Sequence, residues 1–126
     1  MSKCIFVVDD SKTVRASLEY TLGKGGFEVV AAQDGQDGVD RLQELESKGK
    51  RPAMIITDIN MPRMDGIAFI KEVKKKPAFK FVPILVLTTE SQDQKKLEGK
   101  NAGAAGWLVK PFKPEQLIGV VKKFVK

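Results

Sequence analysis

The chain has 126 residues, 42% of them hydrophobic, and a formal net charge of +6. This length suits one domain over residues 1–126 and is too short for two domains of ordinary size. No apolar run approaches the roughly 18 residues of a membrane-spanning helix, and the N-terminal residues lack the pattern of a signal peptide, so we expect a cytoplasmic protein without membrane insertion. The absence of histidine and the single cysteine, Cys4, exclude histidine-dependent catalysis, His-ligated zinc, a phosphohistidine carrier and an internal disulfide.

Apolar runs and amphipathic stretches alternate along the whole chain. The apolar runs predict five strands, at residues 4–8, 27–32, 53–57, 82–87 and 106–109. Between and after them, apolar residues at helical spacing predict helices from Ser11 to the glycines at 23–26, over 39–45, over 67–73, over 91–101 and from Pro114 onward. Asp34 and Gly35 indicate a turn before the second helix. This pattern predicts a single α/β doubly wound domain of five β/α units, with helices on both faces of a central five-stranded parallel sheet.

The predicted helix over 91–101 has little apolar surface with which to anchor itself. Leu97 is its only strongly apolar residue, and Gly99 lowers its intrinsic helix propensity. We therefore predict that this helix is short or mobile.

Lysines occur in runs at 74–76, 95–96 and 122–123. Such runs can bind nucleic acid, but no aromatic residues that could stack on bases are interleaved with them, and no recognition-helix pattern stands out. We interpret the runs as solvated helix faces and expect no nucleic-acid partner.

Polar and charged residues follow four of the predicted strands where each strand ends. They are Asp9 and Asp10, Asp58, Thr88 and Lys110. Singly, the acids and the threonine could cap helices and the lysine could be an ordinary surface residue. Together they form a functional pattern, because ligands of open α/β sheets bind outside the carboxyl ends of the strands.

The chemistry of this set indicates phosphoryl transfer with a bound cation. Crowded carboxylates repel one another and favour a cation, and oxygen ligands without His or Cys select a hard ion, Mg²⁺ or alternatively Mn²⁺. A carboxylate can act as nucleophile and form an acyl phosphate. The cation, the Lys110 ammonium and the Thr88 hydroxyl could each serve one of the three phosphoryl oxygens.

At this point a family resemblance becomes clear. The sequence resembles the receiver domain of two-component response regulators over its whole length, and most closely the stand-alone, CheY-like kind with a flavodoxin/CheY-like fold. The matching segments are VVDDS at 7–11, TDINMPRMDG at 57–66, LT at 87–88 and VKPF at 109–112.

The resemblance implies the roles of the acidic residues. Asp58 would be the phosphoacceptor. Asp10 and Asp58 would bind Mg²⁺ directly together with the backbone carbonyl of Asn60, and Asp9 would act mainly through water. The family pattern also implies a cis peptide bond between Lys110 and Pro111, a type of bond for which the cis penalty is low.

The resemblance also implies a switch. Lys110 and Thr88 would contact the phosphoryl group, and movement of the Thr88 hydroxyl would be coupled to an aromatic residue on the fifth strand, here Trp107. Thr89 and Glu90, which follow Thr88, would belong to the output region. Because tryptophan is bulkier than the usual aromatic at this position, two interpretations stay open: a ring that turns inward, and a fixed ring used for docking.

The expected function is that of a single-domain response regulator in a phosphorelay. A phosphohistidine on a sensor histidine kinase would supply the phosphoryl group, so the chain would be a phosphoacceptor that assists its own phosphorylation and dephosphorylation rather than an enzyme. Since the chain stops at Lys126, output would occur by protein docking, with a flagellar motor switch protein as a candidate target in chemotaxis. The pairing of Asn60 with Glu90 resembles the fast-decaying chemotaxis type. The alternative is an intermediary that passes phosphate to a histidine phosphotransfer protein.

Other classes fit the sequence less well. A Mg²⁺-dependent phosphatase with an aspartyl-phosphate intermediate would resemble Asp-X-Asp-X-Thr after a strand, but the Asp58-Ile59-Asn60 segment lacks the second acid. A nucleotide-binding flavodoxin-like protein would need a phosphate-binding loop after the first strand, and none is present. A receiver that never accepts phosphate is disfavoured because every expected site residue is present.

Overall fold

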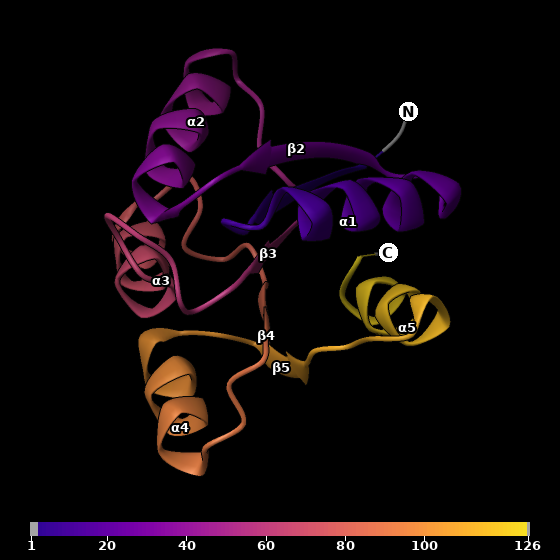
Figure 1. The fold of residues 1–126 in the computed structure, drawn as a ribbon. Helices are drawn as coiled ribbons and strands as arrows, with labels where there is room; N and C mark the ends of the chain where they lie inside the picture. The colour runs from indigo at the N-terminus through magenta and orange to yellow at the C-terminus, as the bar shows by residue number, and fades with distance from the viewer. Residues whose placement is uncertain (1–2, 126) are drawn as a thin grey trace.

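A computed structural model describes residues 3–125, so residues 1, 2 and 126 of the expected domain lie outside it. Strands and helices alternate as the sequence predicts (Figure 1). The strands are β1 (Cys4–Val8), β2 (Glu28–Ala32), β3 (Met54–Thr57), β4 (Ile84–Thr88) and β5 (Gly106–Val109). The helices are α1 (Lys12–Lys24), α2 (Gly35–Ser47), α3 (Gly66–Lys75), α4 (Asp93–Ala102) and α5 (Pro114–Phe124). Over residues 3–125, no helix has both the length and the apolar character needed to cross a membrane.

The strands form one parallel sheet in the order β2-β1-β3-β4-β5. The order reverses between β1 and β3, which makes the carboxyl ends of these two strands the switch point where doubly wound sheets bind ligands. Helices α1 and α5 lie on one face of the sheet and α2, α3 and α4 on the other (Figure 1). The predicted doubly wound fold is confirmed.

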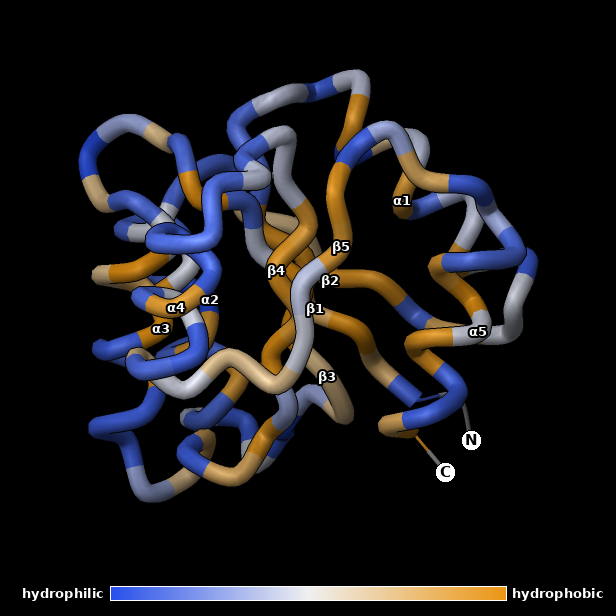
Figure 2. The backbone as a smooth tube through the Cα atoms, turned by 90° about the horizontal axis from the view of Figure 1, so that it is seen from below, coloured by the Kyte–Doolittle hydropathy of each residue, from blue (hydrophilic) through white to orange (hydrophobic). Residues whose placement is uncertain are grey.

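Alternating side chains of the strands belong to two hydrophobic cores, one on each face of the sheet. In β1, Ile5 and Val7 pack beneath α1 and α5, whereas Phe6 and Val8 pack beneath α2 and α3, since successive side chains of a strand point to opposite faces. All four are essentially inaccessible to solvent. Figure 2 shows the hydrophobic central strands and, around them, helices in which hydrophobic and hydrophilic residues are mixed. A strand covered on both faces requires the continuous apolar runs from which it was predicted.

The predicted turn at Asp34 and Gly35 is instead the start of α2. The Asp34 carboxylate accepts a hydrogen bond from the backbone N–H of Asp37 at 2.8 Å and so caps the helix, which begins at Gly35. The sequence signal was ambiguous because Asp followed by Gly is common both in turns and at helix starts.

Strand β4 begins at Ile84, two residues later than predicted, and extends to Thr88. Pro83 has no N–H with which to join the ladder. The N–H of Val82 instead bonds the carbonyl of Phe79 at 3.0 Å in the preceding turn. At its other end the strand includes Thr88, so this predicted site residue is part of the sheet.

Helix α4 is weakly anchored, in agreement with its composition. Leu97, its only strongly apolar residue, is 56% exposed, and Gly99 is the buried residue of the helix. A Cβ atom at Gly99 would lie 2.7 Å from Cζ3 of Trp107, which is closer than such contacts allow. Because Gly99 has no side chain, the backbone of α4 can pack directly against the Trp107 ring.

Candidate functional site

The site residues are held by backbone hydrogen bonds that continue the sheet beyond its strands. The N–H of Asp9 donates to the carbonyl of Ala32 at 3.1 Å, and the N–H of Asp58 donates to Val8 at 2.9 Å. The N–H of Lys110 donates to Thr88 at 2.7 Å. Each functional residue thus follows directly on a paired strand, so its backbone position is set by the sheet and not by a free loop.

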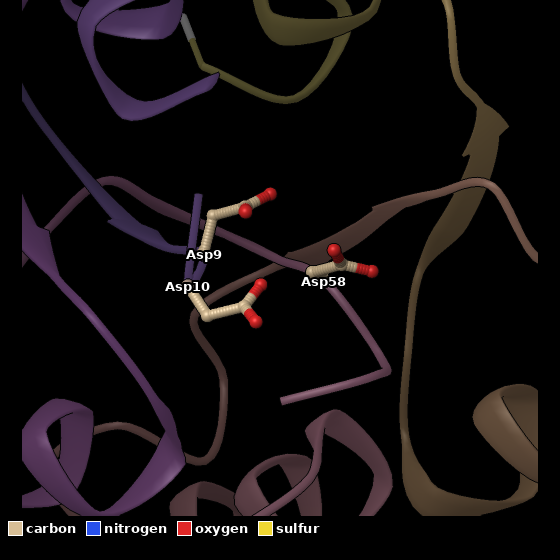
Figure 3. A group of neighbouring side chains, drawn as sticks. All are labelled: Asp9, Asp10 and Asp58. Carbon is tan, nitrogen blue, oxygen red and sulfur yellow. The ribbon is translucent and has the colours of Figure 1, made fainter. Parts of the chain in front are cut away.

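Three carboxylates gather at the carboxyl ends of β1 and β3 (Figure 3). One oxygen from each of Asp9, Asp10 and Asp58 lies within 4.8 Å of the others. Asp9 and Asp58 are buried, at 1% and 8% exposure, whereas Asp10 is exposed. Oxygens bound to Mg²⁺ at about 2.1 Å are at most about 4.2 Å apart, so the cluster needs to close only slightly to fit this ion. The all-oxygen donor set also suits a hard cation.

Lys110 provides the positive charge within the cluster. Its Nζ donates to Oδ2 of Asp9 at 2.8 Å and to Oδ2 of Asp58 at 2.9 Å. Burial by itself lowers the pKa of Lys110, but the hydrogen bonds to the two carboxylates outweigh burial and raise the pKa, so the ammonium stays charged. Burial raises the pKa of Asp9, because its bonds to Lys110 and Ser11 only partly offset the loss of water. The peptide bond between Lys110 and Pro111 is cis, as expected.

The Asp58 carboxylate is oriented by its own loop. Its Oδ1 accepts a hydrogen bond from the N–H of Ile59 at 2.6 Å, while Oδ2 faces Lys110. The loop closes where the N–H of Gly66 donates to the carbonyl of Ile59 at 2.8 Å. A side chain at Gly66 would collide with the carbonyl oxygen of Asp58, so only glycine permits this close return.

Within residues 3–125, the side chains of the remaining predicted residues make no hydrogen bond to the cluster. Thr88 is fully buried, and its hydroxyl accepts a bond from the N–H of Glu90 at 3.3 Å. Asn60 and Thr89 are exposed, and Glu90 and Trp107 are half-buried. Among residues 3–125, the structure therefore brings the three acids and Lys110 together, with Lys110 bonded to Asp9 and Asp58.

The sequence reasoning missed one pair of residues next to the site. Nε and Nη2 of Arg63, in the loop after β3, donate to the two carboxylate oxygens of Asp34 at 2.9 and 3.1 Å. No local sequence pattern predicts this contact, because the two residues are 29 positions apart in the chain. The Arg63 position within the TDINMPRMDG segment was the only available signal.

The fold and the acidic edge of the sheet define a receiver domain. Residues 5–122 match the response regulator receiver domain family, and the chain belongs to that family. Family members are phosphoacceptor switches rather than classical enzymes, and they bind Mg²⁺ at an acidic pocket.

Several characterised proteins are similar to this chain. Protein PilG of Pseudomonas aeruginosa is 36% identical over 121 residues, covering 96% of this chain and 86% of PilG. The structure of the chemotaxis protein CheY4 of Vibrio cholerae superposes with a TM-score of 0.91 and 42% identity, covering 99% of this chain and 100% of that one. The alkaline phosphatase synthesis transcriptional regulatory protein PhoP of Bacillus subtilis is 30% identical over the whole chain, which spans 50% of PhoP.

Proposed function

We propose that this protein is a response regulator that accepts a phosphoryl group on Asp58 from a phosphohistidine of a sensor histidine kinase. One observation carries the assignment: the Lys110 ammonium bridges Asp58 to Asp9 inside a group of three carboxylates. A buried carboxylate held beside a fixed cation is arranged to receive a group that brings further negative charge.

In the proposed reaction a carboxylate oxygen of Asp58 attacks the phosphorus of the phosphohistidine. A P–O bond forms, the P–N bond breaks, and the electron pair returns to the imidazole nitrogen of the donor. The Ile59 N–H and Lys110 orient Asp58 for this attack. Lys110 then stabilises charge on one phosphoryl oxygen. The Thr88 hydroxyl, which accepts the Glu90 N–H in this structure, can turn toward a second phosphoryl oxygen.

The proposed metal ligands are the carboxylates of Asp10 and Asp58 and the backbone carbonyl of Asn60, with Asp9 acting mainly through water. Mg²⁺, or Mn²⁺ in its place, would supply the charge that offsets the carboxylates and the incoming phosphoryl group. Asp10 is exposed at the mouth of the cluster, where an ion can enter from solvent.

A hollow beside the site offers a place for the phosphodonor. It has a volume of about 470 Å³ and is mostly apolar, and it opens next to Lys110. Helix α1 contributes Val14 and Ser17, and the segment after β5 contributes Pro111 and Phe112. A helix of the kinase that presents its histidine here would reach Asp58 while burying its own apolar face.

We place the protein in chemotaxis-type signalling, where phosphorylation would change its binding to a downstream protein. The similarity to CheY4 over its full length supports this assignment. A flagellar motor switch protein is the candidate target, reached through the region of Thr89, Glu90 and Trp107. We also propose a cytoplasmic location, where the exchange with a sensor kinase would take place. The alternative role, passing phosphate to a histidine phosphotransfer protein, would use the same Asp58.

Mass spectrometry after incubation with Mg²⁺ and acetyl phosphate tests the proposal. We expect one phosphoryl adduct in the wild type, none without Mg²⁺ and none in Asp58→Ala. Asp93→Ala, which removes an acid from the first turn of α4, is the matched control and should still be phosphorylated. An adduct that survives in Asp58→Ala, or a wild type that forms none, would refute the assignment. Decay of the adduct over hours would contradict the short lifetime expected from Asn60 and Glu90.

A further inference from the structure

The loop between β3 and α3 is attached to the start of α2 by a two-pronged ion pair. Nε of Arg63 donates to Oδ2 of Asp34 at 2.9 Å, and Nη2 donates to Oδ1 at 3.1 Å. Two parallel bonds of this kind fix the orientation of both groups as well as their distance. The pair lies outside the carboxylate cluster and belongs to no contact that the proposed reaction uses.

The Asp34 side chain is buried and is held in place by hydrogen bonds. It is 5% exposed, and Oδ1 also accepts the N–H of Asp37 at 2.8 Å as the cap of α2. The hydrogen bond from Arg63 lowers the pKa of Asp34, so the carboxylate is ionised throughout the neutral range. Asparagine at position 34 would keep an oxygen that can cap α2 but would lose the negative charge. The capping role and the ion-pair role of Asp34 can therefore be tested separately.

The loop adopts an uncommon backbone shape at the same residue. Arg63 has a φ of 64°, and it is the only residue other than glycine with a positive φ among residues 3–125. Side chains disfavour this region, so a tertiary contact must hold the residue there. Beside it, the N–H of Gly35 donates to the carbonyl of Met64 at 3.1 Å, and a Cβ at Gly35 would lie 2.5 Å from that oxygen.

These contacts pin the loop at both ends, with Asn60 between them. At the inner end the N–H of Gly66 bonds the carbonyl of Ile59 at 2.8 Å. At the outer end Arg63 is held by Asp34. The exposed Asn60 has no side-chain hydrogen bond of its own in the described chain, so its backbone position depends on the two ends of the loop.

We propose that Asp34 and Arg63 are a positioning pair that holds the loop so that the Asn60 carbonyl points at the metal site, and that the pair thereby sets the affinity for Mg²⁺. This inference rests on the proposed function, in which the Asn60 carbonyl is a metal ligand. Mg²⁺ demands near-ideal octahedral geometry and tolerates displacement of a ligand poorly, so a loosened loop should weaken its binding.

For the Arg63 variants, electrostatics alone predicts the opposite result, which makes the proposal testable. Removing the positive charge of Arg63 lowers the repulsion felt by an incoming cation and would strengthen Mg²⁺ binding slightly. Arg41→Ala is the matched control, since the side chain of Arg41 pairs with Asp37 within α2. It removes the same charge from the same region and leaves the loop attached.

The experiment measures Mg²⁺ affinity by isothermal titration calorimetry and loop protection by hydrogen exchange without metal. The variants are Arg63→Ala, Arg63→Gly, Asp34→Asn and Arg41→Ala. We expect Mg²⁺ binding about ten-fold weaker in the first three, the lower end of the effect of groups that orient metal ligands. Faster exchange should be confined to residues 59–65. Arg63→Gly is informative because glycine adopts the positive φ freely, so a loss of affinity there reports the ion pair and not backbone strain.

Each outcome decides one point. Affinities of Arg63→Ala and Arg63→Gly equal to or higher than that of Arg41→Ala would overturn the positioning role. Faster exchange of the loop with unchanged affinity would also overturn it, because the loop would then be loosened without consequence for the metal. A wild type that binds no Mg²⁺ at millimolar concentration would instead overturn the proposed function, and with it the metal role of the pair.

Discussion

The indole nitrogen of Trp107 donates a hydrogen bond to the backbone carbonyl of Glu90 at 3.0 Å. The N–H of Glu90 in turn donates to the hydroxyl of Thr88 at 3.3 Å. One peptide segment therefore links the strand-five tryptophan to the hydroxyl that is proposed to meet the phosphoryl group. The ring is half-buried and packs against the core beneath α3 and α4, so it is neither a free surface ring nor fully enclosed.

This link predicts that phosphorylation changes Trp107 fluorescence. When Thr88 turns toward the phosphoryl group, Glu90 loses its acceptor and can shift, and the indole moves with it or loses its bond. A change in emission on addition of acetyl phosphate and Mg²⁺ is expected in the wild type and not in Asp58→Ala. An unchanged spectrum with Asp58 fully phosphorylated would show that Trp107 is a fixed docking residue.

Gly99→Ala tests the contact between α4 and the tryptophan ring. Alanine gains about 1 kcal/mol of helix propensity over glycine, but overpacking of a tight contact costs about 1–3 kcal/mol. When Trp107 is present, we therefore expect Gly99→Ala either to leave the free energy of unfolding nearly unchanged or to lower it. In a Trp107→Phe background the clash is relieved, and we expect Gly99→Ala to be more favourable by about 1–2 kcal/mol, measured by urea unfolding of all four proteins. Equal effects in both backgrounds would mean that the helix does not rest on the ring.

Hydrogen exchange should distinguish α4 from α5. Helix α4 buries one glycine, whereas α5 buries Leu117 and Val121, so local opening of α4 exposes much less apolar surface. Amides in the middle of α4 should exchange faster than those in α5, by a factor of about 10 for each 1.4 kcal/mol of lower opening free energy. Equal protection in the two helices would contradict the weak anchoring.

Mg²⁺ should stabilise the folded protein, and chelation should reverse the effect. In the proposed function the ion binds the folded cluster and not the unfolded chain, so a concentration of 100 times its dissociation constant should raise the free energy of unfolding by about 2.7 kcal/mol. Asp10→Asn should be at least as stable as the wild type without Mg²⁺, because one repelling charge is gone, and should lose most of the response to the ion. Asp93→Asn is the control and should respond as the wild type does. A full response in Asp10→Asn would exclude Asp10 as a ligand.

Asp34→Asn should lower stability at neutral pH but not at strongly acidic pH. Arg63 lowers the folded-state pKa of Asp34 below the ordinary value of 3.8. The stabilisation is therefore complete above that value and is lost as pH falls through the folded pKa. We expect a difference of about 1 kcal/mol at pH 7, kept small because Arg63 is largely exposed and asparagine still caps α2. Thermal unfolding of both proteins from pH 7 to pH 2 checks this, and a difference that persists at the acid end would point to a lost cap instead.

Local pattern was sufficient for most of the fold because this sheet is buried on both faces. The runs that end at Val8, Thr57 and Val109 predicted strands whose last residues match those of the structure. The exceptions have local causes. Pro83 delayed β4, and Asp34 capped a helix where a turn was expected. Pro83 has no N–H to pair with a neighbouring strand, whereas the role of Asp34 is decided by its hydrogen-bond partner, the N–H of Asp37.

The sequence by itself determined the strands, the helices and the chemical types that meet at one sheet edge. Residues such as Asp9 and Asp58 follow short apolar runs, and the alternation of these runs with amphipathic stretches is typical of a buried parallel sheet. Tertiary structure alone decided which groups touch. It placed the Lys110 ammonium between two carboxylates, seated Gly99 on the ring of Trp107 and brought Arg63 to Asp34. The physical reason is that periodicity records which face of an element is buried, whereas a hydrogen bond or an ion pair depends on positions within a few tenths of an ångström. Those positions are set only when all the layers have packed together.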